Sequence, residues 1–134
     1  MDIRNRIGKE ILVLDGACGT ALQTFYGLGA GELPETWCFK KPEVIEELHT
    51  KYLESGADII LTNTFGANFF KFQDKTTDYI KQAVKIARKA ADKKKGSYVA
   101  LDIGPTGELM KPIGDLSFED AYKVFKEIVV AGKG

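Results

Sequence analysis

Three short apolar runs along the chain each end in a polar residue that is closely followed by glycine. The runs and the residues after them are 11–14 with Asp15-Gly16, 59–62 with Asn63-Thr64-Phe65-Gly66, and 98–101 with Asp102-Ile103-Gly104. Apolar runs without alternation are typical of parallel strands that are covered on both faces. Because α/β sheets and barrels build their sites at the carboxyl ends of strands, the pattern predicts one ring of polar side chains, and an incomplete one.

Segments with helical periodicity separate these strands and follow the last of them. We expect a short helix within residues 19–26, a second from Pro42 to just before Gly56, and a third over about 77–94. A fourth helix follows Ser117, which resembles a capping box with Asp120. The apolar face predicted for this helix comprises Phe118, Ala121, Tyr122, Phe125, Ile128 and Val129.

The segment 33–39, between the first two helices, is long and carries aromatic residues. These features favour a lid or a binding loop over a plain connector. Trp37 in this segment has two open interpretations, because it could cover a ligand or anchor the loop.

The order of elements is therefore strand, short helix, loop, helix, strand, helix, strand, helix. It predicts an α/β fold in one domain over residues 1–134: a partial (β/α)₈ TIM barrel with about the first three βα units, parallel strands and outer helices. A complete barrel takes ~250 residues. Because three strands leave open apolar edges, we expect that the chain is part of a larger barrel or that it self-associates through those edges.

The composition narrows the class of partner. The chain has 44% hydrophobic and 28% charged residues, which is typical of a globular protein. Nineteen basic residues offset nineteen acidic ones, so we expect no nucleic-acid partner and no anionic membrane. No apolar stretch approaches the ~20 residues of a membrane span. Without a secretory signal at the start, Cys18 and Cys38 favour free thiols and a cytoplasmic location.

The polar residues at the strand ends have both functional and structural interpretations. Asp15 could accept hydrogen bonds from an ammonium group, or it could cap the short helix that follows. Asn63 and Thr64 offer an amide and a hydroxyl to a ligand, or they brace the loop. For Asp102 the sequence does not decide between ligand binding and loop bracing, whereas for Thr106 it favours bracing.

A metal or nucleotide site formed by this chain alone is not expected. Cys18 and Cys38 lie twenty residues apart, and His49, the only histidine, lies inside a predicted helix. The chain has no CxxC or HxxxH spacing, which argues against a zinc site. Neither GxGxxG after a strand nor GxxxxGK[ST] is present, so both nucleotide fingerprints are missing.

The strand-end motifs resemble those of a known family. The segments 15–20, 56–68 and 102–107 are similar, in this order, to motifs of homocysteine S-methyltransferase domains. The continuation 109–115 is most similar to the homocysteine-binding module of cobalamin-dependent methionine synthases. The resemblance covers nearly the whole chain from Leu12 onward.

This resemblance implies a barrel that holds zinc at the carboxyl ends of its strands. In such enzymes three cysteines bind the zinc, and the zinc activates the homocysteine thiol for methyl transfer. Those cysteines come from later strands, and Cys18 and Cys38 do not match them, so no metal ligand and no catalytic residue is assigned here. Cobalamin and methyltetrahydrofolate are implied only through other modules of a parent enzyme.

What the resemblance does assign is the amino-acid end of the substrate site. The implied homocysteine-binding positions are Asp15, Gly16, Asn63, Thr64, Asp102 and Gly104. The function that follows is transfer of a methyl group to homocysteine to form methionine, with the isolated chain expected to be inactive. Two alternatives stay open: a methyltransferase that uses S-methylmethionine or betaine, and a non-catalytic, self-associating α/β module that binds an amino acid.

Overall fold

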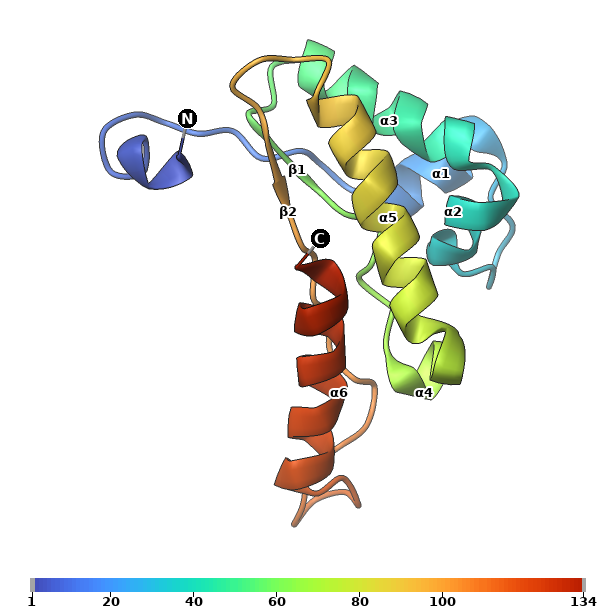
Figure 1. Cartoon of the computed structure of the whole chain (residues 1–134). Helices are drawn as coiled ribbons and strands as arrows, with labels where there is room; N and C mark the ends of the chain where they lie inside the picture. Colours follow the sequence, from blue (N-terminus) through green and yellow to red (C-terminus); the bar gives the residue numbers. More distant parts are fainter. Residues whose placement is uncertain (1, 134) are drawn as a thin grey trace.

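The computed structural model describes residues 2–133, which form a helix-rich α/β arrangement (Figure 1). The helices are α1 (Cys18–Tyr26), α2 (Trp37–Lys40), α3 (Pro42–Glu54), α4 (Phe69–Phe72), α5 (Thr76–Ala91) and α6 (Phe118–Gly132). The strands are β1 (Ile59–Leu61) and β2 (Tyr98–Ala100), and short 3₁₀ turns are η1 (Ile3–Asn5), η2 (Pro34–Thr36) and η3 (Gln73–Lys75). The predicted helices are confirmed to within a few residues at their ends.

The sheet contains two of the three predicted strands. β1 and β2 pair in parallel, as expected. The run 11–14 lies beside β1 but forms only a single parallel bridge, between Leu14 and Ile59. The prediction of three full strands is therefore not confirmed. The run is at the edge, where it can pair on one side only, and the backbone N–H of Val13 donates to the carboxylate of Asp58 instead of to a strand.

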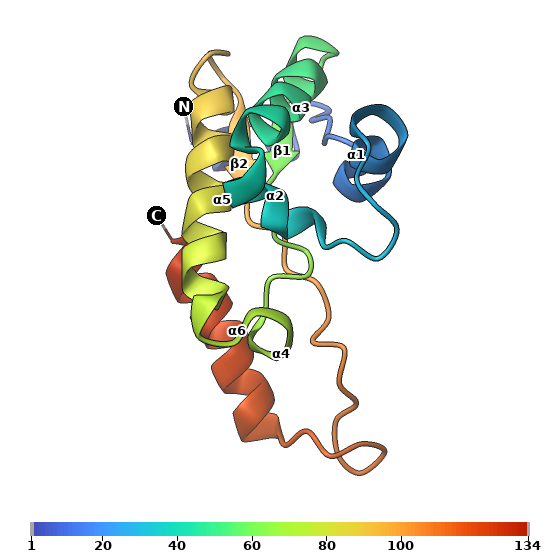
Figure 2. The same cartoon turned by 90° about the vertical axis from the view of Figure 1, so that its right-hand side faces the viewer.

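Helices cover one face of this small sheet. In Figure 2, α3 and α5 lie in front of β1 and β2. Ile60 of β1 is fully buried and belongs to a cluster with Leu53 of α3 and Ala87 of α5. The opposite side is open, and Leu14 beside β1 is 53% exposed. The apolar runs predicted strands that are covered on both faces. Among the described residues, only one face of the sheet is covered.

Local signals explain where the helices begin and end. Pro42 occupies the first turn of α3, where its missing N–H costs no hydrogen bond. Gly27 ends α1 in the left-handed region at φ 79°, and its N–H donates to the carbonyl of Leu22. The Ser117 hydroxyl accepts from the N–H of Asp120, which confirms the predicted cap of α6.

The buried face of α6 differs from the predicted one. Its buried residues are Ala121, Val124, Ile128 and Ala131, and the last three form a cluster with Ile80 of α5 and Phe72 of α4. Four residues of the predicted apolar face, namely Phe118, Tyr122, Phe125 and Val129, are exposed instead. The apolar stripe of α6 is wider than its contact with α5, so part of it has no neighbour among the described residues.

The segment 33–39 is not an open loop. It forms η2 and α2, and Trp37 at the start of α2 is 2% exposed. The indole N–H of Trp37 donates to the Glu32 carboxylate at 2.9 Å, and the Lys41 ammonium lies over its ring at 4.1 Å. These contacts favour the anchoring interpretation of Trp37 over the ligand-covering one.

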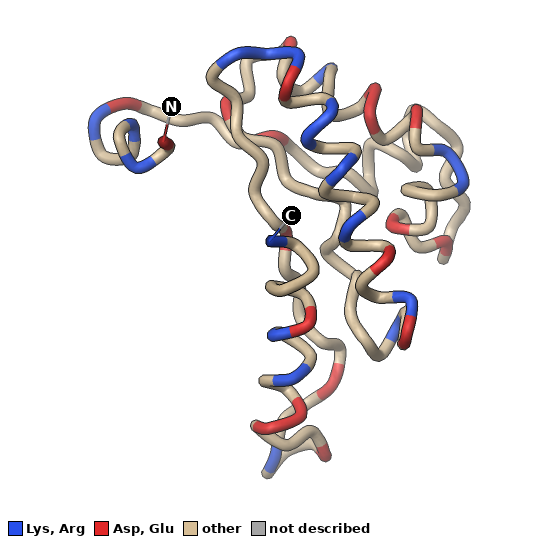
Figure 3. The backbone as a smooth tube through the Cα atoms, in the orientation of Figure 1, with Lys and Arg blue, Asp and Glu red and all other residues tan. Residues whose placement is uncertain are grey.

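Charge is distributed without a dominant sign. Figure 3 shows basic and acidic residues interspersed along the helices. Between residues 2 and 133, none of the helices combines the length and apolarity that crossing a membrane requires.

The pH dependence of stability tests the packing of α3. His49 is 2% exposed, its Nε2 has no partner within the described chain, and burial lowers its pKa to about 4. In the unfolded chain the histidine pKa is about 6.5, so the unfolded state binds a proton first as the pH falls. The folded state therefore loses stability between pH 6.5 and about 4, by about 3 kcal/mol in all.

We expect a His49→Leu variant to lose this pH-dependent part of the unfolding free energy. Urea unfolding at pH 7 and pH 4 measures it, since the drop in unfolding free energy should be about 3 kcal/mol smaller in the variant than in the parent chain. Equal drops in both proteins would show that His49 is not held neutral.

Candidate functional site

The carboxyl ends of β1 and β2 are joined by a closed cycle of hydrogen bonds. The Thr64 hydroxyl donates to the Asp102 carbonyl at 2.6 Å, and the Asp102 N–H donates to the Thr62 hydroxyl at 3.1 Å. The two hydroxyls lie 2.7 Å apart. Because each hydroxyl has one proton and that of Thr64 is already donated, the Thr62 hydroxyl donates to Thr64. Thr64, which is 1% exposed, therefore braces the two strand ends.

Asn63 also faces the protein rather than a ligand. Its side-chain amide donates to the carbonyl of Pro34 at 2.9 Å and to the Cys38 sulfur at 3.6 Å. It thereby ties the loop after β1 to η2 and α2. Thr106 is likewise buried, and its hydroxyl accepts from the N–H of Glu108, in keeping with the predicted bracing role.

Asp15 does not cap the first helix. The N-cap of α1 is Ala17, and no side chain forms a cap hydrogen bond there. The Oδ2 atom of Asp15 instead accepts from the N–H of Leu61 at 3.0 Å, while its Oδ1 atom is buried without a partner. Burial raises the pKa of Asp15, and the nearby negative charge of Asp102 raises it further. This free oxygen is suited to accept a hydrogen bond from a ligand N–H.

The two predicted glycines permit close approach of other groups. A Cβ atom at Gly104 would overlap the carbonyl of Phe65, so the loops after β1 and β2 could not meet with any other residue there. A Cβ atom at Gly16 would lie 2.9 Å from the Tyr52 hydroxyl oxygen. That hydroxyl donates to the carbonyl of Ala17 and holds the turn after Asp15.

A hollow of about 490 Å³, which we call the strand-end hollow, opens beside these groups. Its wall includes Asn63, Thr64 and Asp102 of the six predicted site residues. The other three, Asp15, Gly16 and Gly104, do not line it. The Asp102 carboxylate takes no part in the hydrogen-bond cycle, and burial raises its pKa.

Glu35 also lines the strand-end hollow, and the sequence analysis did not identify it. The residue is 4% exposed, and its Oε1 atom accepts from the N–H of Gly66 at 2.5 Å. Its Oε2 atom is buried and has no partner in the described chain. The available sequence signal was one acidic residue between a proline and a tryptophan, in a segment rich in apolar residues.

The cysteines do not fit a zinc centre. Cys18 lines the strand-end hollow and Cys38 lies buried behind it. Burial raises the pKa of each thiol to about 12, and for Cys18 the charge of Glu35 adds to this effect. Zinc binds cysteine as thiolate, and burial disfavours that form of both side chains. Within residues 2–133 no group of three or more His, Cys, Asp or Glu side chains could hold a metal ion.

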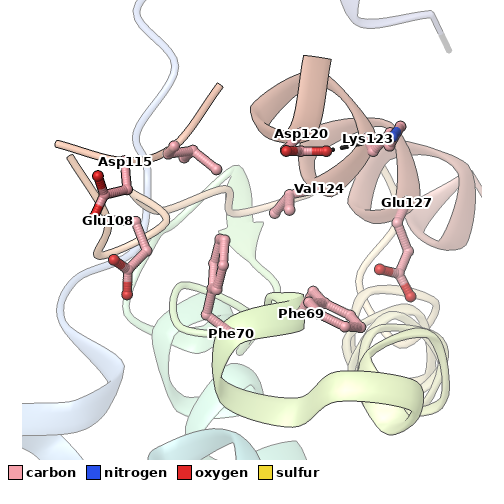
Figure 4. A pocket seen from close by; sticks show the side chains of 9 residues that line it. Phe69, Phe70, Glu108, Asp115, Asp120, Lys123, Val124 and Glu127 are labelled. Carbon is pink, nitrogen blue, oxygen red and sulfur yellow. Dashed lines mark hydrogen bonds and ion pairs between the residues drawn. The ribbon is translucent and has the colours of Figure 1, made fainter. Parts of the chain in front are cut away.

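A second hollow, of about 470 Å³, lies between α4 and α6 (Figure 4). Phe69 and Phe70 form its apolar side, while Asp120 pairs with Lys123 at 3.3 Å and Glu127 accepts from Thr77. It contains none of the predicted site residues, and its best-placed charges already have partners. The strand-end hollow is therefore the better candidate.

Comparisons with known proteins find similar sequences and a similar fold. A sequence model of the homocysteine S-methyltransferase family matches residues 12–133. The methionine synthases of Mycobacterium leprae and Mycobacterium tuberculosis are each 34% identical over 90% of this chain. The metallated form of the homocysteine methyltransferase MmuM from Escherichia coli superposes with a TM-score of 0.79 at 24% identity, covering 96% of this chain. Its apo form gives 0.72 at 26% identity, covering 98%.

The chain is much shorter than these relatives. It spans 11% and 12% of the two methionine synthases, and 52% and 48% of the two MmuM chains.

A Thr64→Val variant tests the hydrogen-bond cycle. Valine keeps the shape of threonine but leaves the Asp102 carbonyl and the Thr62 hydroxyl without their partner, so we expect a loss of about 1–3 kcal/mol in unfolding free energy. Thr50→Val is the matched control, because the Thr50 hydroxyl bonds only to the Glu46 carbonyl of its own helix. Urea unfolding measures both, and a Thr64→Val loss no larger than that of the control would contradict the cycle.

Proposed function

Because the chain belongs to the homocysteine S-methyltransferase family, we propose that it forms the homocysteine-binding part of a methyltransferase barrel. The intact barrel would transfer a methyl group to the homocysteine thiol and release methionine. The observation that carries this proposal is the buried, unpartnered Oδ1 atom of Asp15 at the carboxyl end of a parallel strand. A carboxylate so placed can bind the ammonium group that every amino-acid substrate carries.

The six predicted residues divide into two roles in this proposal. We assign ligand contacts to the Asp102 carboxylate, which lines the strand-end hollow, and to the Asp15 carboxylate and the Gly16 backbone N–H next to it in the chain. Asn63, Thr64 and Gly104 position the loops that carry them, through the bonds to Pro34 and Asp102 and the close approach to Phe65. Substrate binding then depends on the loop-positioning residues as much as on the ligand-contacting ones, because a displaced loop no longer holds its hydrogen-bonding groups near the substrate.

We do not assign activation of the substrate sulfur to this chain. Zinc would have to be bound by thiolates, and the described residues do not bring such a set together. We therefore derive no step through a metal, and we propose that the isolated chain forms no methionine.

Methylcobalamin with methyltetrahydrofolate is the donor system that the likeness to methionine synthases favours. S-methylmethionine and betaine are the alternative donors. Two free cysteines fit the reducing cytoplasm that we propose as its location.

Calorimetry with reduced homocysteine tests the binding role. We expect the chain to bind homocysteine without added zinc, and Asp15→Asn to weaken binding by about tenfold or more, since a charge-assisted hydrogen bond is lost. Asp92→Asn is the matched control, because Asp92 is exposed just after α5 and does not line the strand-end hollow.

The same samples test catalytic silence. Mass spectrometry should find no methionine after incubation with homocysteine and each of methylcobalamin, S-methylmethionine and betaine. Methionine formation by the chain alone would contradict the proposal, and so would an Asp15→Asn variant that binds as the parent chain does.

A second candidate function is a self-associating module that binds an amino acid without converting it. The exposed apolar residues favour it: Ile11 at the sheet edge is 89% exposed, and the outer face of α6 carries Phe118 and Val129 in the open. Uncovered strand edges and apolar patches of this kind mark association surfaces.

Sedimentation velocity tests this second candidate. It predicts a discrete oligomer that Ile11→Glu converts to monomer, because a charge is placed on the sheet edge. Ile113→Glu should leave the oligomer intact, since Ile113 is equally exposed but lies in the loop before α6. A parent chain that sediments as a monomer at about 100 μM would exclude the module.

A further inference from the structure

We propose that Glu35 is a second anchor for the substrate ammonium group, and that Lys71 on the same hollow binds the substrate carboxylate. The strand-end hollow would then select a zwitterionic amino acid over a thiol that lacks either charge. This inference rests on the proposed homocysteine-binding function and adds two residues to it.

The first argument is the unusual state of the Glu35 side chain. It is 4% exposed, yet only one of its two oxygens has a partner, the N–H of Gly66. A carboxylate that served only to brace Gly66 would not need to bury a second oxygen unpartnered at the wall of a cavity. A ligand N–H donor in the hollow would satisfy that oxygen.

The second argument is the convergence of charge on one place. Glu35, Asp15 and Asp102 are the three carboxylates whose negative charges, after burial and Cys38, help to raise the pKa of Cys18. The electric fields of these three carboxylates therefore overlap at Cys18, at the start of α1 beside the hollow. An ammonium group has three N–H donors, so binding by Glu35 leaves donors for Asp15 and for Asp102, which lines the same hollow.

The third argument is the position of the Lys71 cation. A Cβ atom built on Gly66 would lie 2.8 Å from Glu35 Oε1 and 3.1 Å from Lys71 Nζ, so both side chains face the same side of that glycine. Among the ion pairs of residues 2–133, Lys71 takes part in none. The hollow thus presents one free cation near the carboxylates, which suits the opposite charges of an amino acid.

Calorimetry with two ligands tests the inference: homocysteine, and 4-mercaptobutanoate, which has the same carbon chain and thiol without the amino group. The variant Glu35→Gln keeps an oxygen for the N–H of Gly66 but loses the negative charge. We expect it to weaken homocysteine binding about 10- to 100-fold and to change 4-mercaptobutanoate binding less than about twofold. Lys71→Met should weaken both ligands, because both keep the carboxylate.

Each other outcome overturns the inference in a distinguishable way. Equal homocysteine binding by Glu35→Gln and the parent chain, with Asp15→Asn still impaired, removes Glu35 from the site and leaves the proposed function standing. Loss of both ligands in Glu35→Gln assigns Glu35 a structural role only. Normal binding of both ligands by Lys71→Met removes Lys71. A parent chain that binds neither ligand overturns this inference together with the proposed function.

Discussion

The site depends on how the carboxyl ends of the two parallel strands are held together. Parallel pairing brings the ends of β1 and β2 to one edge, and the cycle through the hydroxyls of Thr62 and Thr64 and the backbone of Asp102 joins them there. Each group in the cycle is both donor and acceptor in a buried setting, so removing any one leaves others unpaired.

Three carboxylates at or near the strand-end hollow share one arrangement. Asp15 and Glu35 each use one oxygen to hold a backbone N–H, of Leu61 and Gly66 respectively, and each keeps the other oxygen free. Asp102 is held through its backbone, which leaves its carboxylate out of the cycle. One part of each residue thus holds the scaffold, and in the proposed function the remaining part is available to a ligand.

The opposite side of the molecule shows what the described residues leave uncovered. Helices pack on one face of the sheet, while Leu14 and the outer stripe of α6 stay open. Structures of the E. coli homocysteine methyltransferase match this chain over about half of their length. In a closed barrel each strand pairs with two neighbouring strands, and each outer helix packs between two others. Such neighbours would cover the apolar residues that are exposed here.

The sequence by itself determined the four longer helices and two of the three strands in their order, the helix ends at Gly27, Gly56 and Ser117, and the family. These depend on local rules, in which caps, glycines and periodicity act over a few residues, and on motifs that are continuous in the chain. It also places the six candidate residues directly after the three apolar runs, where the ends of parallel strands are expected.

Only the tertiary structure decided what those residues do. Asn63 and Thr64 became braces because Pro34 and Asp102, 29 and 38 residues away, offer carbonyls at the right distance. Glu35 came to the wall of the hollow because η2 turns it toward Gly66, and Phe118, Tyr122 and Val129 of α6 stayed exposed because its neighbours cover the other side of the helix. Such outcomes depend on which distant groups become neighbours. A local pattern does not contain that information, because the same side chain can pair, brace or face a cavity.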